Sequence, residues 1–334
     1  MRKTIFSLTI VFVFFISFFS LVFYSETASG NQTSPNQSYI VRRKISINDI
    51  FSKEEIDKAT KQANFPVSKF SKSKKIIPRK KKEAKDFKLP SDLKALVYDL
   101  NSSKILYKQN EEKKNSIASI TKLMTTLVFL DTDIKWDQYY KIKKEDIVKG
   151  GRAHIYIGEE IKIKDLFFLS LIASDNTAAK ALAHSTGIED FPQAMNKKAK
   201  SLGLLSTSFV DPVGISFLDI STAKDVALLL KNALKQEKIK DAIFRKDYNF
   251  KTLKGREVKV YSTDWLFKKQ NNNFKHLGGK TGYTESAGYC FAGVFKNNNK
   301  HDIITVILNS PTINSRFKYS NDLASWVFKN YLWS

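Results

Sequence analysis

The longest hydrophobic run of the sequence lies at its N-terminus. Arg2 and Lys3 precede a stretch from Thr4 to Tyr24 that carries no charge and is apolar on every helical face. As a helix rising about 1.5 Å per residue, this stretch would reach roughly 31 Å, the thickness of a bilayer's hydrocarbon core. We therefore expect residues 1–24 to form a membrane anchor or a signal segment. The two preceding cations would stay in the cytoplasm and leave the rest of the chain outside it.

Residues 25–86 are mostly polar and basic. The stretch Asn31–Ser38 contains no hydrophobic residue, and Lys72–Lys88 holds nine basic residues among seventeen. This composition predicts a polar, Lys-rich linker whose charges are solvated. A second interpretation is contact with anionic lipid headgroups or wall polymers. Nucleic acid is a poor partner, because the basic run would lie outside the cytoplasm and has no interleaved aromatic residues to stack on bases.

From residue 87 the pattern becomes that of a folded domain, which we expect to span residues 87–334. Short β-prone runs stand near both of its ends, at Ala95–Leu100, Ile105–Lys108, Gly288–Lys296 and Asp302–Leu308. Helical periodicity is clearest at Asp165–Ile172, Thr222–Leu234 and around Asn321–Leu332. Strands at both ends with helices between them predict an α/β (α+β) fold. Its antiparallel sheet would be built from both ends of the domain, flanked by helices, and interrupted by an inserted helical subdomain.

Composition narrows the classes of protein that remain. The chain has 334 residues, of which 42% are hydrophobic, so it can build a sizeable core. Its one cysteine, Cys290, excludes an intramolecular disulfide framework and a cysteine-cluster metal site. We expect Cys290 to pack as a small apolar residue in or against a strand. The net charge of +23 suggests an anionic partner without naming it.

Candidate chemistry begins with a serine activated by a lysine. The chain has four histidines, no Gly-x-Ser-x-Gly elbow and no His-Glu-x-x-His pair, so histidine-based hydrolysis has little support. In a Ser-x-x-Lys pattern the two side chains share one helix face, which places the amine beside the hydroxyl. The pattern occurs five times, at Ser71, Ser91, Ser119, Ser221 and Ser315. Only Ser119, with Lys122, opens an apolar helical run that would bury one face and hold the pair rigidly.

Two further motifs follow Ser119 in order. Ser174-Asp175-Asn176 lies 55 residues later, between two helical stretches, and Lys280-Thr281-Gly282 lies 161 residues later, before strand texture. The Ser-x-x-Lys and Ser-x-Asn patterns are weak alone, and Lys-Thr-Gly occurs once. The three together, in this order, are typical of penicillin-binding proteins and class A β-lactamases.

The similarity extends beyond these motifs. The segments that carry it are Ala118–Thr125, Phe209–Gly214, Ser221–Asp225 and Gly279–Cys290. On these residues, the chain from about residue 88 to 334 resembles the catalytic domain of the D-alanyl-D-alanine carboxypeptidases, the low-molecular-mass penicillin-binding proteins. The resemblance implies a β-lactamase/transpeptidase-like fold. Ile117 departs from the family, which usually has proline there, and we expect little consequence. Since many members carry a C-terminal membrane helix, we expect the N-terminal segment to replace that anchor.

The resemblance also implies a role for each candidate site residue. Ser119 would be the nucleophile that forms an acyl-enzyme with the penultimate D-alanine, and Lys122 its base. Ser174 would relay a proton to the leaving amine, while Asn176 would bind the peptide backbone and order Lys122. The remaining candidates would bind substrate: Lys280, Thr281 and Arg316 its carboxylate, and Tyr283 the oxyanion, through its N–H together with that of Ser119, with Gly282 between them. For Arg316, a solvated arginine at a helix start is an equally good interpretation. No metal and no organic cofactor is implied.

Lysine can act as this base only if its cation is disfavoured. Burial of Lys122 would do so, and we expect Lys280 to supply a second nearby cation with the same effect.

Three other functions remain open at this point. A class A-like β-lactamase would need a glutamate within a Glu-x-x-Leu-Asn pattern, and none occurs between Asn176 and Lys280. A D-alanyl endopeptidase that cuts cross-links would use the same residues, because specificity lies in pocket shape. A non-catalytic wall-binding module would have a decayed site, against which the intact motifs argue.

The sequence therefore predicts a serine-type D-Ala-D-Ala carboxypeptidase at the outer face of a bacterial cell membrane, or secreted to the wall. Its partners would be peptidoglycan stem peptides, β-lactam antibiotics as covalent inhibitors, and the membrane through the N-terminal segment.

Overall fold

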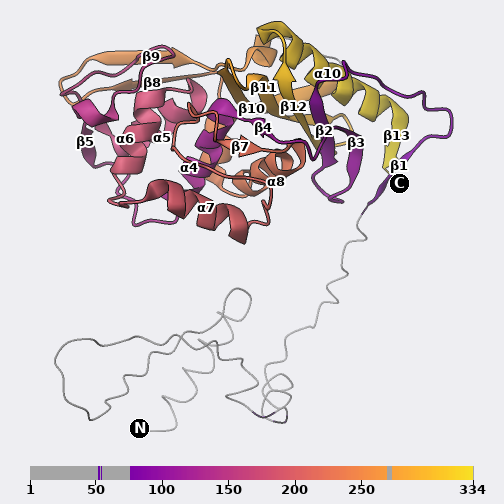
Figure 1. The fold of residues 1–334 in the computed structure, drawn as a ribbon, viewed down its shortest axis with the longest axis horizontal. Coiled ribbons are helices and arrows are strands. Elements are labelled where there is room, and N and C mark those ends of the chain that lie inside the picture. Colours follow the sequence, from indigo (N-terminus) through magenta and orange to yellow (C-terminus); the bar gives the residue numbers. More distant parts are fainter. Residues whose placement is uncertain (1–51, 53, 55–75, 269–272, 334) are drawn as a thin grey trace. The chain divides into compact units, whose positions relative to one another are not determined.

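A computed structural model describes residues 52, 54, 76–268 and 273–333 (Figure 1). The chain divides into residues 1–73 and 74–334, and the fold described below belongs to the second of these units. Within the described residues, no helix is both long and apolar enough to cross a membrane. The predicted anchor at residues 1–24 lies outside the described residues.

The centre of the domain is a five-stranded antiparallel sheet in the order β10-β11-β12-β2-β3. Its strands are β10 (Phe274–Thr284), β11 (Gly288–Asn297), β12 (Asp302–Ser310), β2 (Lys94–Asp99) and β3 (Ile105–Gln109). Strands β2 and β3 come from the start of the domain and the other three from its end, which confirms the sheet predicted from both ends. The order leaves β10 at one edge of the sheet.

Alternate residues of the strands pack on opposite faces of the sheet. One face packs on helix α10 (Ile313–Asn330), and the other packs on helix α8 (Ala223–Ala233). The α10 face carries Ala95, Val97, Phe291, Phe295, Ile303 and Ile307. The α8 face carries Leu96, Tyr98, Ala292, Val294, Ile304 and Val306. Because both faces are buried, these strands read as continuous hydrophobic runs in the sequence.

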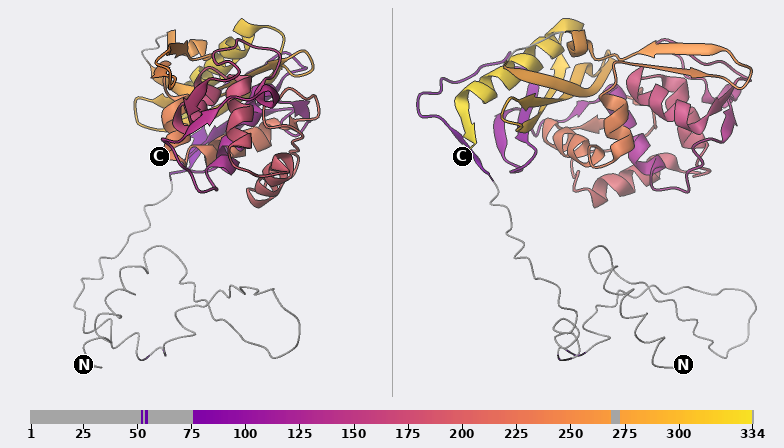
Figure 2. Two further views of the ribbon diagram at one scale, coloured as in Figure 1. Left: turned by 90° about the vertical axis from the view of Figure 1, so that its left-hand side faces the viewer. Right: turned by 180° about the vertical axis from the view of Figure 1, so that it is seen from behind.

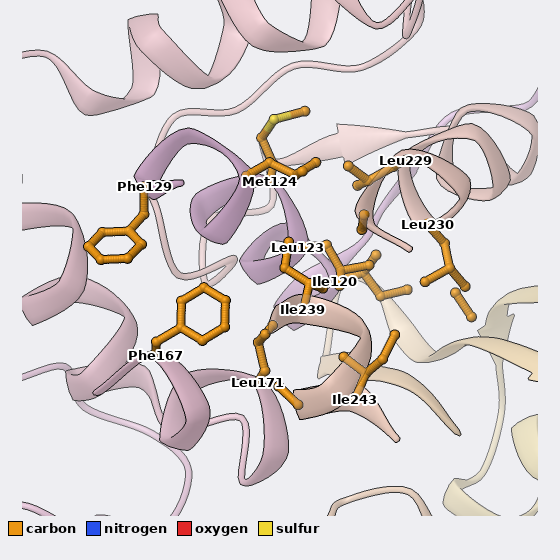
Figure 3. Packing of buried hydrophobic residues seen from close by; sticks show 14 of the residues in the cluster. Ile120, Leu123, Met124, Phe129, Phe167, Leu171, Leu229, Leu230, Ile239 and Ile243 are labelled. Carbon is orange, nitrogen blue, oxygen red and sulfur yellow. The ribbon is translucent and has the colours of Figure 1, made fainter. Parts of the chain in front are cut away.

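A helical region is inserted between β3 and β10, as predicted, and lies at the other end of the domain from α10 (Figures 1 and 2). It contains α4 (Lys122–Phe129), α5 (Ile163–Ile172), α6 (Asn176–His184), α7 (Phe191–Ser201) and α9 (Glu237–Ile243). Figure 3 shows its core, where Ile120 and Leu123 meet Phe167, Leu171 and Ile239. This core fixes the start of α4, where the candidate nucleophile stands.

The remaining elements of the domain are short. Four two-stranded sheets pair β1 (Pro78–Lys80) with β13 (Tyr331–Trp333), β4 (Asn115–Ser116) with β7 (Ile220–Ser221), β5 (Tyr139–Lys141) with β6 (Glu160–Lys162), and β8 (Asp247–Lys251) with β9 (Glu257–Tyr261). The 3-10 helices are η1 (Ala118–Thr121), η2 (Lys144–Asp146) and η3 (Trp265–Lys268). The β8–β9 hairpin extends over the helical region (Figure 1), where Arg256 binds Glu159.

The last helix differs from its prediction. It begins at Ile313, eight residues before the expected start, and it ends at Asn330, after which Tyr331–Trp333 form β13. Thr312 caps the helix by accepting the N–H of Ser315, and the polar first turns hid this start in the hydrophobic pattern.

The folded region also begins earlier than residue 87. Strand β1 pairs with β13, the N–H of Lys81 donates to the carbonyl of Asn330 (2.9 Å), and the indole of Trp326 donates to the carbonyl of Lys85 (3.0 Å). The predicted linker of residues 25–86 is therefore wrong at its C-terminal end. Backbone bonds hold this basic stretch, so no hydrophobic pattern signalled it.

Candidate active site

The candidate nucleophile, Ser119, stands at a strained turn between strand and helix. Ser119 lies in η1, and the preceding Ala118 has a φ of 47°, in the left-handed region that favours glycine. The N–H of Ile117 donates to the carbonyl of Asp219 at 3.0 Å. A Cβ on Gly214 would come within 2.1 Å of the carbonyl oxygen of Ala118. Contacts with Asp219 and with Gly214 therefore hold the backbone in place just before Ser119.

Lys122 is fully buried and bonded to three oxygens. Its Nζ lies 2.7 Å from Ser119 Oγ, 2.9 Å from Asn176 Oδ1 and 2.8 Å from the carbonyl oxygen of Val213. The structure therefore brings together Ser119, Lys122 and Asn176, as the sequence predicts. With the amine already in contact with the hydroxyl, proton transfer needs no rearrangement.

Burial lowers the pKa of Lys122 from 10.5 to about 7, against the opposing charges of Asp175, Asp211 and Asp219. Near neutral pH a large fraction of Lys122 is therefore a free amine, which can accept the proton of Ser119.

The second motif forms the corner between α5 and α6. Ser174 has a φ of 59°, another left-handed residue that is not glycine. Asp175 caps α6 by accepting the N–H of Ala178 at 2.8 Å, and Asn176 begins the helix. These constraints aim the side chain of Asn176 at Lys122.

Lys280 extends from edge strand β10 to the second motif. Its Nζ donates to Ser174 Oγ at 2.7 Å and to the carbonyl of Thr281 at 3.1 Å, and its side chain is fully buried. Burial lowers its pKa well below 10.5, and the charges of Lys122 and Arg316 lower it further. Ser174 is thus bonded to Lys280, whereas Asn176 is bonded to Lys122.

The two buried amines repel each other, so the site disfavours having both protonated in the absence of an anion. Burial dominates the lowered pKa of Lys122, whereas the expected effect of a second cation appears at Lys280. A carboxylate that bound beside Lys280 would offset this repulsion and favour the protonated form of Lys280.

The third motif packs directly against the backbone around Ser119. A Cβ on Gly282 would lie 2.6 Å from the carbonyl oxygen of Ile117 and 3.2 Å from the backbone nitrogen of Ser119, so only glycine allows β10 to approach η1. Thr281 is buried, and its hydroxyl bonds to that of Thr263 at 2.6 Å. Tyr283, the next residue of β10, is half exposed.

Arg316 is buried, so the interpretation as a solvated arginine is wrong. It lies in the first turn of α10 and donates to the carbonyls of Gly282 (3.0 Å) and Cys290 (3.4 Å). Burial lowers its pKa to about 10. Its charge helps to lower the pKa of Lys280, while its hydrogen bonds to Gly282 and Cys290 hold the backbone of β10 and β11. Arg316 therefore supports the strand and adds positive charge beneath it.

The sequence did not reveal the loop that holds the lysine. Asp211 accepts the N–H groups of Val213 (2.6 Å), Gly214 (2.6 Å) and Ser216 (2.9 Å). These bonds fix the carbonyl of Val213, which accepts Lys122. An Asp-Pro-x-Gly pattern is a turn signal, and only the fold shows which carbonyl it aims at the amine.

His154 is a second contact that the sequence did not reveal. Its Nδ1 lies 2.8 Å from Asp175 Oδ2, and its N–H donates to the same oxygen at 3.2 Å. The same loop supplies the carbonyl of Gly150, which accepts Asn176 Nδ2 at 2.9 Å. This loop therefore holds both polar side chains that follow Ser174.

Cys290 is buried in β11, as predicted, and burial raises its pKa to about 11. In the described part of the chain, no three His, Cys, Asp or Glu side chains form a group that could hold a metal ion.

The sequence profile of the D-alanyl-D-alanine carboxypeptidases matches residues 81–312. The chain belongs to this family. It is 33% identical over 238 residues to a D-alanyl-D-alanine endopeptidase of Escherichia coli, covering 70% of this chain and 76% of that one. It is 32% identical over 253 residues to the D-alanyl-D-alanine carboxypeptidase DacF of Bacillus subtilis, covering 71% and 62% of the two chains.

Solved structures of penicillin-binding proteins share the fold. Penicillin-binding protein D2 from Listeria monocytogenes, in its cefotaxime-bound form, superposes with a TM-score of 0.64 and 30% identity, covering 73% of this chain and 99% of that one. The Streptomyces K15 DD-transpeptidase superposes with a TM-score of 0.67 at 23% identity, over 73% and 99% of the two chains, and supports the fold alone. The predicted fold class is thereby confirmed.

Proposed function

We propose that this family member is a serine-type D-Ala-D-Ala carboxypeptidase that removes the terminal D-alanine from peptidoglycan stem pentapeptides. The observation that carries the proposal is the 2.7 Å contact between Ser119 Oγ and the buried amine of Lys122, whose pKa is about 7. The neighbouring Lys280, with Thr281, provides the cationic end of the site for the substrate's carboxylate.

Acylation follows from this geometry. Ser119 Oγ attacks the carbonyl carbon of the penultimate D-alanine while its proton passes to Lys122 Nζ. The backbone N–H groups of Ser119 and Tyr283 stabilise the oxyanion, a contribution that is typically worth 100-fold or more in rate per donor. The C–N bond then breaks, and the leaving amine takes up the proton that Lys122 accepted, relayed through the hydroxyl of Ser174, which in the free site is bonded to Lys280. Water hydrolyses the ester by the reverse proton path and restores Ser119.

The loop after the second motif argues against a β-lactamase. The carboxylate of Asp211 is engaged by three backbone N–H groups. A group held in this way lacks the freedom to activate a water for rapid deacylation. A penicilloyl-enzyme should therefore persist, so rapid steady-state hydrolysis of benzylpenicillin by the pure protein would contradict this assignment.

A D-alanyl endopeptidase that cuts cross-links is the second candidate. The relatives of Escherichia coli and Pseudomonas aeruginosa, 33% and 31% identical, carry that name, whereas those of Bacillus subtilis and others carry the carboxypeptidase name. An endopeptidase would use the same catalytic steps as a carboxypeptidase and would differ in the part of the cleft that binds the leaving group.

The proposal extends to partners and location. Stem peptides and β-lactams would reach Ser119 outside the cytoplasm, with residues 1–24 as a membrane anchor or signal segment and the basic linker near anionic lipid or wall polymers. The predicted charge asymmetry of residues 1–24 and the excess of lysine after them support this location.

Labelling with a fluorescent penicillin tests the nucleophile. The wild-type protein should form a covalent adduct that Ser119→Ala abolishes. Ser91→Ala, the same change in an exposed Ser-x-x-Lys pattern, should label fully. No labelling of a folded wild-type protein would favour a non-catalytic wall-binding module. Incubation with a pentapeptide, and with a cross-linked dimer in parallel, then separates carboxypeptidase from endopeptidase by the products released.

A further inference from the structure

A cleft on the surface lies at the C-terminal end of β10, the strand that carries the third motif. This cleft of about 360 Å³ lies beside Tyr283, the residue after the third motif, and its other walls include Asp92, Leu93, Glu285 and Tyr289. Gly282 packs against the backbone of Ser119, and Tyr283, the next residue, lines the cleft. The cleft therefore begins one residue beyond that contact.

The charge of this cleft is opposite to that of the protein. The chain carries a net charge of +23, yet the cleft is lined by Asp92 and Glu285 and by no lysine or arginine. By contrast, a larger cleft beside α10 is lined by Lys81, Lys85 and Lys329 together with its acidic residues. Among the described residues, neither carboxylate of the smaller cleft has an ion-pair partner within 4.0 Å. Asp92 acts electrostatically on Lys94, whose amine donates a hydrogen bond to Asn115 Oδ1 at 3.0 Å.

Aromatic rings form the floor beside these carboxylates. The rings of Tyr283 and Tyr289 stack with centroids 4.2 Å apart, and half of the surface of Tyr283 is exposed. The guanidinium of Arg316 lies 5.4 Å from the ring of Tyr289, so that tyrosine is already engaged by a cation. The pKa of the Tyr283 phenol is raised first by Tyr289, then by burial, and least by the charge of Glu285, so this carboxylate acts on the phenol. A ring face next to a carboxylate attracts a primary ammonium group.

The expected course of a bound peptide along β10 leads to this cleft. This step rests on the proposed function, in which the terminal carboxylate of the peptide lies at Lys280 and Thr281. The outer edge of β10 pairs with no described strand, so an extended peptide can run along it. With its carboxylate end at Lys280, the rest of the peptide leaves past Gly282 toward Tyr283.

We propose that the cleft is a subsite for a primary ammonium group on the side chain of the stem peptide's third residue, that is, for a diamino acid whose side-chain amine is free. Glu285 supplies the charge, Tyr283 the ring face, and Asp92 a second carboxylate farther along the wall. Glu285 is thereby a specificity-determining residue rather than a catalytic one.

Two matched substrates test the proposal. One is Nα-acetyl-L-lysyl-D-alanyl-D-alanine with a free side-chain amine, and the other carries an acetyl group on that amine. We expect wild-type kcat/KM, measured by D-alanine release, to be about three- to tenfold higher for the free amine. Glu285→Gln should remove most of this preference by lowering kcat/KM for the free amine alone, and Asp92→Asn should remove part of it. Glu189→Gln, an exposed carboxylate on another loop, should leave the preference intact.

Benzylpenicillin, which carries no amine, separates this proposal from the proposed function. All three variants should acylate at the wild-type rate. Equal kcat/KM for the two peptides in the wild type, or a preference that survives Glu285→Gln and Asp92→Asn combined, overturns the subsite while the carboxypeptidase stands. If neither peptide releases D-alanine although Ser119 labels, the carboxypeptidase assignment fails. In that case the two peptides are compared as competitors of penicillin labelling. Stronger competition by the free-amine peptide, lost in Glu285→Gln, supports the subsite, and equal competition overturns it.

Discussion

At the scale of single residues, two lysines in one buried site take different parts because their contacts differ. Lys122 is bonded to Ser119 and is the proposed base, whereas Lys280 is bonded to Ser174 and is the proposed partner of the substrate's carboxylate. Burying either lysine cation without a nearby anion costs free energy. A substrate carboxylate that binds beside Lys280 lowers that cost for Lys280. Substrate binding and protonation of Lys280 are therefore coupled.

Removal of the Lys280 amine should affect carboxylate substrates selectively. Lys280→Gln should lower the second-order rate of acylation by benzylpenicillin on the order of 100-fold, since loss of one partner of a buried charge pair costs about 3 kcal/mol. The methyl ester of the same antibiotic, which has no carboxylate, should lose much less. Stopped-flow acylation measures both rates, and Lys275→Gln, exposed on the same strand, is the control. Equal losses for acid and ester would contradict the assigned role.

At the scale of elements, the site depends on how closely β10 approaches η1. The missing side chain of Gly282 lets the two backbones meet, and the apolar residues around Ile120 and Leu123 hold η1 and α4 against movement (Figure 3). Three elements distant in sequence thus place their polar groups within hydrogen-bonding distance.

A methyl group at Gly282 should disrupt this approach. Gly282→Ala would set Cβ 2.6 Å from the carbonyl oxygen of Ile117, a backbone atom that cannot turn away. We expect acylation to fall by about 100-fold, because displacement of a nucleophile by 1 Å has effects of that size. Gly187→Ala, where nothing lies within 4 Å of the added atom, should cost about 1 kcal/mol through its positive φ and leave acylation unchanged. Wild-type acylation by a folded Gly282→Ala protein would refute the close contact.

Much of this arrangement could be predicted from the sequence, and the remainder depends on contacts that leave no pattern. Ser119 and Lys122 share a helix face, so their spacing alone predicts their contact. The carbonyl of Val213 and the pair formed by His154 and Asp175 depend on how separate loops fold together. A backbone carbonyl is present at every position, so no residue type marks the one that binds the amine.

At the scale of the whole molecule, the two ends of the folded region close on each other. Strand β1 pairs with β13, and Phe87 packs near Tyr107 and Trp326. This closure uses the C-terminal end of α10, ten residues after Arg316, and none of the elements that carry Ser119, Lys122, Ser174 or Lys280. It should therefore contribute to stability and leave catalysis unaffected.

A shortened chain tests this separation. A protein that begins at Phe87, the boundary expected from hydrophobic patterning, lacks β1 and the carbonyl that binds Trp326. Compared with one that begins at Ile76, it should lose about 2 kcal/mol and unfold roughly 4–8 °C lower, with a changed tryptophan emission. Penicillin acylation at 20 °C should be unchanged. Identical melting temperatures would show that the pairing adds no stability.

The central claim is that a buried neutral amine takes the proton of Ser119, and the pH dependence of acylation tests it most directly. Because burial lowers the pKa of Lys122 to about 7, the free amine predominates above that pH and is lost below it. The second-order rate of acylation by benzylpenicillin, followed from pH 5.5 to 9, should rise with a midpoint near pH 7 and then level off. A rate that is flat across this range, or that is still rising tenfold per pH unit at pH 9, would contradict the account.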